Sequence, residues 1–146
     1  MLKKIVFALL AAVVAVLGYA TTRPDSYTVE RKITVNAPVE KIYVNLVSFK
    51  RWDAWSPWVK RDPTMLTTFS GAESGVGAKY AWKGNSDVGE GKMEITDVSP
   101  NRVAVKLDFI KPFENLGNVA TFSLVPNGVS TDVTWTMKAP RHLYRR

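Results

Sequence analysis

The chain has 146 residues, which suffices for one domain with a substantial hydrophobic core. Its formal net charge is +7, but no concentrated basic stripe lies inside the domain, which argues against a nucleic-acid binder and fits a mild attraction to anionic membrane surfaces. Cysteine is absent, so disulfides, thiolate nucleophiles and zinc–cysteine sites are excluded.

The first 22 residues have the pattern of an export leader. Two lysines precede sixteen uncharged, mostly apolar residues, 5–20. This run is longer than a typical signal-peptide core and slightly shorter than the ~20 residues that a spanning helix prefers. Gly18 and Ala20 suit cleavage after Ala20, whereas the high apolar content favours an uncleaved anchor. We expect residues 1–22 to form a hydrophobic helix, either signal anchor or signal peptide, with the domain outside the cytoplasm.

A strand and a short helix are predicted next. Apolar and polar residues alternate over 27–35, which indicates a strand with one face in water, and Arg31 interrupts the apolar face. Pro38 then opens a helix whose apolar residues recur at spacings of three and four up to Val47. One side of this helix must therefore lie on an apolar surface.

The segment 49–58 contains three of the five tryptophans, Trp52, Trp55 and Trp58. Their spacing of three places the rings on one face of a helical or 3₁₀ turn, and Pro57 restricts the backbone near its end. The rings could be ordinary core or the wall of a ligand cavity. Both interpretations hold together if the core is hollow.

From residue 65 onward the sequence predicts five or six antiparallel strands. Apolar and polar residues alternate clearly over 103–109 and 133–137. Short turn-forming segments separate the strands, at 85–87, 99–101 and 126–128, and Asn127-Gly128 is the strongest hairpin signal. A sheet of this kind, with large aromatic residues on one face, must curve and cover that face.

Catalytic and metal-binding patterns are weak. The single histidine, His142, lies in the basic terminal tail, and the glycine-rich stretches lack the context of a phosphate or dinucleotide loop. Glu90 and Glu94 would lie ~13 Å apart on a strand, beyond the usual range of paired carboxylates. Asp108 fits a charge on the wet face of a strand. We therefore assign no catalytic residue, no metal ligand and no cofactor.

The order of motifs resembles a known superfamily. The strand and short helix are followed by Arg-Trp-x-x-Trp-Ser-Pro-Trp at 51–58, Gly-x-Gly-Ala-x-Tyr-x-Trp at 75–82 and Gly-x-Met-Glu-Ile-Thr at 91–96. This pattern is similar to the START-like polyketide cyclase/dehydrase superfamily, in particular to its exported or membrane-anchored bacterial members, known as SRPBCC proteins. The resemblance covers a domain over residues 26–140.

The resemblance implies an α+β helix-grip fold. In such a fold a curved antiparallel sheet, with short helices after the first strand, wraps around a long C-terminal helix and leaves a hydrophobic cavity between them. Here a basic tail, 141–146, stands where that helix usually follows. We therefore expect the long helix to be missing, by truncation or a change of frame. An uncovered concave face would favour a sticky monomer or a homodimer that shares it.

The expected function is the binding of a hydrophobic small molecule or lipid, without catalysis. The expected ligand-binding residues are Trp55, Trp58, Tyr80, Trp82, Met93, Leu107, Phe109, Phe122 and Trp135. The leader would place the domain at the bacterial inner membrane or, after cleavage, in the periplasm or medium, and no nucleic-acid partner is expected. A cyclase- or hydrolase-like enzyme, a protein-interaction module and a truncated product without function stay open as alternatives.

Overall fold

The computed structural model describes residues 11–19 and 26–140 of the chain. Residues 11–19 are helical. The domain's elements, in chain order, are β1 (Ser26–Val35), α2 (Val39–Leu46), the 3₁₀ helix η1 (Phe49–Ala54), α3 (Pro57–Arg61), β2 (Leu66–Gly71), β3 (Ala78–Lys83), β4 (Glu90–Ser99), β5 (Arg102–Lys111), β6 (Asn115–Asn127) and β7 (Ser130–Pro140). The predicted order of one strand, short helices and five or six further strands is confirmed, with six strands after the helices.

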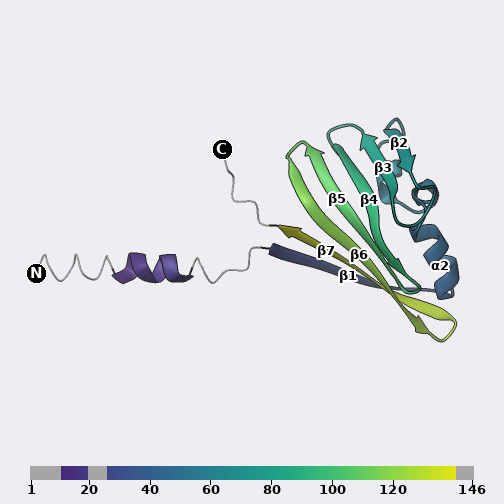
Figure 1. Cartoon of the computed structure of the whole chain (residues 1–146), viewed down its shortest axis with the longest axis horizontal. Helices are drawn as coiled ribbons and strands as arrows, with labels where there is room; N and C mark the ends of the chain where they lie inside the picture. The colour runs from purple at the N-terminus through teal and green to yellow at the C-terminus, as the bar shows by residue number, and fades with distance from the viewer. Residues whose placement is uncertain (1–10, 20–25, 141–146) are drawn as a thin grey trace, which may run out of the picture.

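The seven strands form one curved antiparallel sheet (Figure 1). Their order is β1-β7-β6-β5-β4-β3-β2, so β2 to β7 form a meander and the first strand pairs with the last. This pairing runs without a break from Ser26 opposite Pro140 to Val35 opposite Thr131. The α+β helix-grip expectation is therefore confirmed for the sheet and the short helices.

The turn between β6 and β7 fixes the register of the sheet's inner face. Asn127 pairs with Ser130, which leaves Gly128 and Val129 as a two-residue loop. Gly128 has a φ of 62°, in the left-handed region that glycine adopts without steric cost. The predicted hairpin at Asn127-Gly128 therefore forms, and the resulting register sets Phe122 opposite Trp135.

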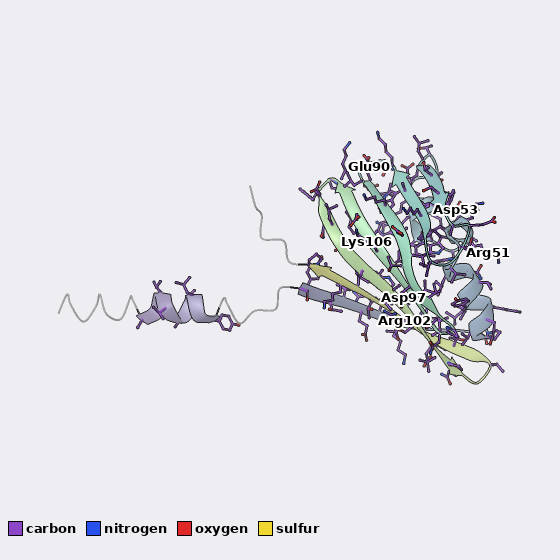
Figure 2. The ribbon with its side chains drawn as sticks, viewed as in Figure 1. Arg51, Asp53, Glu90, Asp97, Arg102 and Lys106 are labelled. Carbon is purple, nitrogen blue, oxygen red and sulfur yellow. The ribbon has the colours of Figure 1, made fainter. Side chains whose placement is uncertain are left out.

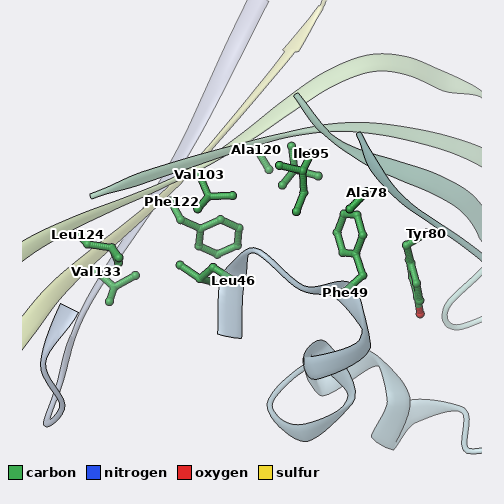
Figure 3. Close-up of a cluster of buried hydrophobic side chains, with 11 residues drawn as sticks. Leu46, Phe49, Ala78, Tyr80, Ile95, Val103, Ala120, Phe122, Leu124 and Val133 are labelled. Carbon is green, nitrogen blue, oxygen red and sulfur yellow. The ribbon is translucent and has the colours of Figure 1, made fainter. Parts of the chain in front are cut away.

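The core lies between the concave face of the sheet and the segment formed by α2 and η1 (Figure 3). Leu46 at the end of α2 is 5% exposed and Phe49 at the start of η1 is 2% exposed. Both belong to one cluster with sheet residues such as Ile95 and Phe122. Burial of these side chains holds the short helices on the sheet, because helices of this length are marginal on their own.

The concave face is only partly covered. No long helix lies over it within residues 11–19 and 26–140, and the tail 141–146 lies outside the described residues. On the edge strand β1, Ile33 is 64% exposed although its register partner on β7, Val133, belongs to the core cluster. The described chain therefore leaves the β1 end of this face open.

The predicted leader falls mostly outside the described residues, which include only 11–19 of positions 1–22. Among the described residues, no helix has both the length and the apolar character needed to cross a membrane. The choice between an anchor and a cleaved leader stays a prediction.

Candidate ligand cavity

The tryptophan segment is shaped by the start of α3. Ser56 caps this helix, and its hydroxyl oxygen accepts a hydrogen bond from the backbone N–H of Trp58 at 3.4 Å. Pro57 occupies the first helical turn, where its missing N–H costs nothing. The chain therefore turns between Trp55 and Trp58, so that the segment forms two short helices rather than the single turn expected from the spacing.

Asp62 fixes the far end of α3. Its carboxylate accepts hydrogen bonds from the Thr64 hydroxyl at 2.7 Å and the Thr64 N–H at 3.0 Å. It also accepts one from the N–H of Asn85, in the turn between β3 and β4, at 2.8 Å. These hydrogen bonds, that of the Thr64 hydroxyl foremost, lower the pKa of Asp62 from its ordinary value. One wall of the site is thereby tied to the sheet.

Three indole rings of the site have their polar edges satisfied by the main chain. Each N–H donates to a backbone carbonyl: Trp52 to Leu46 at 3.1 Å, Trp55 to Asn45 at 3.4 Å and Trp82 to Val88 at 3.0 Å. Because these donors are satisfied by the main chain, the rings can present carbon surface without leaving a buried N–H unpaired. They form an apolar wall.

Aromatic contacts join this wall to the sheet. The ring centroids of Trp52 and Trp55 lie 4.9 Å apart, and both rings meet Phe122 of β6 edge-on, at 5.9 and 6.3 Å. Phe49 contacts Trp52 at 5.0 Å, also edge-on. These distances and angles are those that aromatic pairs prefer. The rings of Trp52 and Trp55 therefore gather on the side of Phe122.

The opposite wall depends on a glycine. Trp82 of β3 lies across Gly91 of β4, and a Cβ at position 91 would fall 2.4 Å from the Trp82 ring and 2.7 Å from the carbonyl oxygen of Asp108. The missing side chain lets the indole lie close to the strand and meet Phe109 of β5 at 6.1 Å. Glycine is needed here for close approach.

These walls enclose a cavity of about 620 Å³. Its lining residues are Arg31, Phe49, Trp52, Asp53, Trp55, Ser56, Pro57, Trp58, Val59, Met65, Tyr80, Trp82, Val88, Met93, Leu107, Phe109, Ala120, Phe122, Trp135 and Met137. All nine residues selected from the sequence are among them. The volume lies within the ordinary range of small-molecule sites.

The cavity has a buried floor and an open rim. Tyr80, Leu107 and Phe122 are each less than one-tenth exposed, whereas Trp55 is 41% and Trp58 51% exposed. The guanidinium of Arg61 lies 5.1 Å from the centre of the Trp58 ring, a cation–π contact at the rim. A ligand could thus enter beside these two tryptophans.

Most charged side chains of β4 and β5 lie outside the cavity. Figure 2 shows Asp97 beside Arg102, with which it forms an ion pair, and Lys106 farther along the sheet. Further pairs are Lys79–Glu94 at 4.0 Å, Lys106–Asp108 at 3.8 Å and Lys111–Glu90 at 3.3 Å. Asp108 also accepts a hydrogen bond from the N–H of Gly117 at 2.7 Å. Asp108, expected on the wet face, is instead buried at 7% exposure beside Gly117, and all three carboxylates considered from the sequence make structural contacts.

The titratable groups in the cavity are few. Burial, and secondarily the charge of Asp53, raise the pKa of Tyr80 to about 12, so its phenol stays neutral near pH 7. A neutral phenol can donate or accept a hydrogen bond but does not act as a base. Across the described part of the chain, no group of three acidic or histidine side chains could hold a metal ion.

Several lining residues were not selected from the sequence. Met65 and Val88 flank strands, Met137 lies within β7, and none of the three carries a chemical signal of its own. Asp53 lies within the tryptophan segment, where a charged residue is typical of a solvated turn. Arg31 does carry a signal, because it interrupts the apolar alternation of β1. A charge at an inward position indicates a functional or edge-protecting role.

The fold and cavity define a hydrophobic-ligand protein of the helix-grip class, and the sequence comparison agrees. The family model described as polyketide cyclase / dehydrase and lipid transport matches residues 26–143. The chain belongs to this family, as the motifs at 51–58, 75–82 and 91–96 indicate. A comparison with curated proteins finds no match.

Solved structures share the fold at low identity. The Mll3558 protein from Rhizobium loti is 18% identical with a TM-score of 0.58, covering 77% of this chain and 78% of that one. The Aha1 dimer from Colwellia psychrerythraea is 20% identical with a TM-score of 0.57, covering 81% and 80%. Ara h 8.0201 is 11% identical with a TM-score of 0.59, covering 83% and 82%. At such identities these likenesses show the fold alone.

Proposed function

We propose that the domain binds a hydrophobic small molecule or lipid in its cavity and does not transform it. The observation that carries this proposal is the lining of the 620 Å³ cavity, in which all five tryptophans take part and, among the described residues, only Arg31 and Asp53 are charged. The family's description, which includes lipid transport, supports hydrophobic-ligand binding in general.

The placement of Glu94 and Asp108, the two carboxylates considered from the sequence as nearest to the aromatic residues, supports a binding rather than a catalytic role. Glu94 lies between Met93 and Ile95, whose side chains face inward, and its carboxylate pairs with Lys79 on the outer face. Asp108 alternates in the same way between Leu107 and Phe109. A general base must reach its proton within hydrogen-bond distance, directly or through one water, and neither carboxylate is placed for that.

Apolar contact alone can supply useful affinity. Burying about 200 Å² of ligand surface yields roughly 5 kcal/mol before the costs of ordering. That corresponds to affinities between micromolar and millimolar, which suit a carrier that must also release its ligand.

The test measures 1-decanol binding to the full chain by tryptophan fluorescence, together with mass spectrometry of lipids that co-purify. We expect saturable quenching, because every tryptophan lines the cavity. Met137→Trp, which places a larger side chain in the cavity, should weaken binding at least roughly tenfold, ~1.4 kcal/mol. Val129→Trp, in an 83% exposed turn position, is the matched control. An unsaturable response and no co-purified lipid would refute the proposal.

We also propose that the open part of the concave face joins two copies of the chain. A second hollow of about 410 Å³ lies along this face, lined by residues that include Ile33, Val35 and Val133. Ile33 is largely exposed there, and apolar patches of this kind favour association. One structure with the same fold, that of Aha1, is described as a dimer.

The oligomeric state tests this second proposal. Sedimentation equilibrium of the full chain should show a monomer–dimer equilibrium that Ile33→Lys shifts toward monomer by at least roughly tenfold, since each copy would bury that side chain. Val125→Lys is the control, because Val125 is also exposed but alternates with the buried Leu124 on the other face of β6. A wild-type chain that stays monomeric at all concentrations would contradict the proposal.

A further inference from the structure

Arg31 occupies an unusual position in the cavity wall. It lies in the middle of β1, opposite Trp135 of β7, and shares its side of the strand with Val29 and Ile33. Its side chain lines both the 620 Å³ cavity and the adjoining 410 Å³ hollow. It is the only cationic side chain that lines the larger cavity among the residues that the structure describes.

No protein carboxylate neutralises this cation within residues 26–140. The guanidinium Nη1 donates to the carbonyl oxygen of Glu30 at 2.9 Å, and no acidic side chain of the described residues forms an ion pair with it. The neighbouring Lys32, in contrast, pairs with Asp132 at 3.4 Å. Arg31 thus has guanidinium donors that no carboxylate of the described residues engages.

Among the described residues, one anionic side chain lines the cavity, that of Asp53, and it lies away from Arg31. Asp53 lies in η1, which packs against β3. In the sheet order, β1 and β3 are separated by five strand spacings of roughly 4.8 Å each. The β1 end of the cavity is therefore positive and the β3 end negative, with aromatic and methionine side chains between them.

We propose that the preferred ligand is an amphiphile with one apolar tail and an anionic head group that Arg31 binds at the β1 end. This inference rests on the proposed binding function. A guanidinium presents a planar fork of donors that fits a carboxylate or a phosphate through two hydrogen bonds. The tail then lies among Trp135, Met137 and Phe122, beside the guanidinium.

A structural role for Arg31, protection of an edge strand, competes with the ligand-binding role, and the test must distinguish the two. β1 is an edge strand, and inward-pointing charges on edge strands prevent association of sheets. If protection of the edge were its only role, replacing Arg31 would increase self-association and leave ligand preference unchanged. The two roles therefore predict different measurements.

The experiment compares decanoate with 1-decanol, which have the same tail length and differ in charge. Affinities for the full chain are measured by tryptophan fluorescence, below the micelle concentration and without detergent. Removing the guanidinium in Arg31→Gln should reduce the decanoate-to-decanol affinity ratio roughly fivefold, as for a charge pair open to solvent. Arg51→Gln is the matched control, because Arg51 is exposed and lines neither hollow.

Decyl phosphate is the third ligand tested. If Arg31→Gln loses more affinity for decyl phosphate than for decanoate, the head group is assigned to phosphate. Sedimentation of the same variants reports any gain in self-association. An affinity ratio unchanged by Arg31→Gln, with 1-decanol still bound, would overturn the role of Arg31 and leave the proposed function intact. If neither probe binds, the proposed function fails, and this inference fails with it.

Discussion

At the scale of residues, the site depends on indole N–H groups that are satisfied by the main chain and on one position that lacks a side chain. The indole N–H groups of Trp52, Trp55 and Trp82 are satisfied by main-chain carbonyls, which leaves carbon surface for the cavity. At position 91 the absence of a side chain makes room for the Trp82 ring. The sequence pattern predicts which aromatic rings line the site, but it does not predict the space that these rings need.

We predict that Gly91→Ala destabilises the domain by about 1–3 kcal/mol, the usual cost of overpacking. The added Cβ would meet both the Trp82 ring and the Asp108 carbonyl oxygen at less than 3 Å. The ring can move into the cavity, but the backbone oxygen cannot move without disturbing the β4–β5 pairing. Urea unfolding followed by circular dichroism measures the change.

Lys92→Ala provides the control, since it alters an exposed side chain on the same strand. It should change the free energy of unfolding by less than about 0.5 kcal/mol. Equal stability of Gly91→Ala and wild type would show that the Trp82 wall is not confined by position 91.

At the scale of elements, the tryptophan segment differs from the sequence prediction in an informative way. The spacing of Trp52, Trp55 and Trp58 predicts one helical face, and all three rings do line the cavity. Trp52 lies in η1, Trp55 follows its end and Trp58 lies in α3, because Ser56 and Pro57 begin a new helix. The periodicity thus predicts that the rings share one side. It does not predict the break between the two helices, which Ser56 and Pro57 cause by starting α3.

We predict that Trp52→Phe costs about 2–3 kcal/mol of stability. The change removes the hydrogen bond from the indole to the carbonyl of Leu46, at 3.1 Å, and part of the ring that contacts Phe49 and Phe122. This bond ties η1 to the end of α2, so its loss should loosen the helical side of the cavity.

Trp58→Phe is the matched comparison, because the same atoms are removed from a ring that is 51% exposed at the rim. We expect a loss below about 1 kcal/mol for it. Thermal unfolding of both variants measures the difference. If Trp58→Phe proved the more destabilising, the assignment of Trp52 to the support and of Trp58 to the entrance would be wrong.

At the scale of the whole molecule, the fold could be predicted from the sequence, whereas the site could be predicted only in part. Alternation over 103–109 and 133–137 and the Asn127-Gly128 turn predict an antiparallel meander, and its hairpins form as expected. The large side chains that line the cavity also follow from this alternation. The volume of the void does not, because it depends on how Gly91, Ala120 and the short helices space those side chains. Nor does the position of Arg31 relative to Asp53, which depends on the strand order.

We propose that the leader delivers the cavity to the outer side of a bacterial inner membrane. Its two lysines precede a long apolar run, and basic residues are retained on the cytoplasmic side. Alkaline phosphatase fused after Pro140 should therefore be active in a bacterial host, and deletion of residues 1–22 should abolish that activity while leaving the fusion in the cytoplasm.

The intact mass of the exported chain then separates the two fates of the leader. A mass that starts at Met1, recovered with membranes, indicates an anchor, which would hold the cavity beside the lipid from which it could draw its ligand. A mass that starts at Thr21, recovered in the soluble periplasm, indicates a free carrier, because cleavage after Ala20 removes the apolar run. If the fusion is inactive both with and without residues 1–22, the proposed export is contradicted, and the ligand must be sought inside the cell.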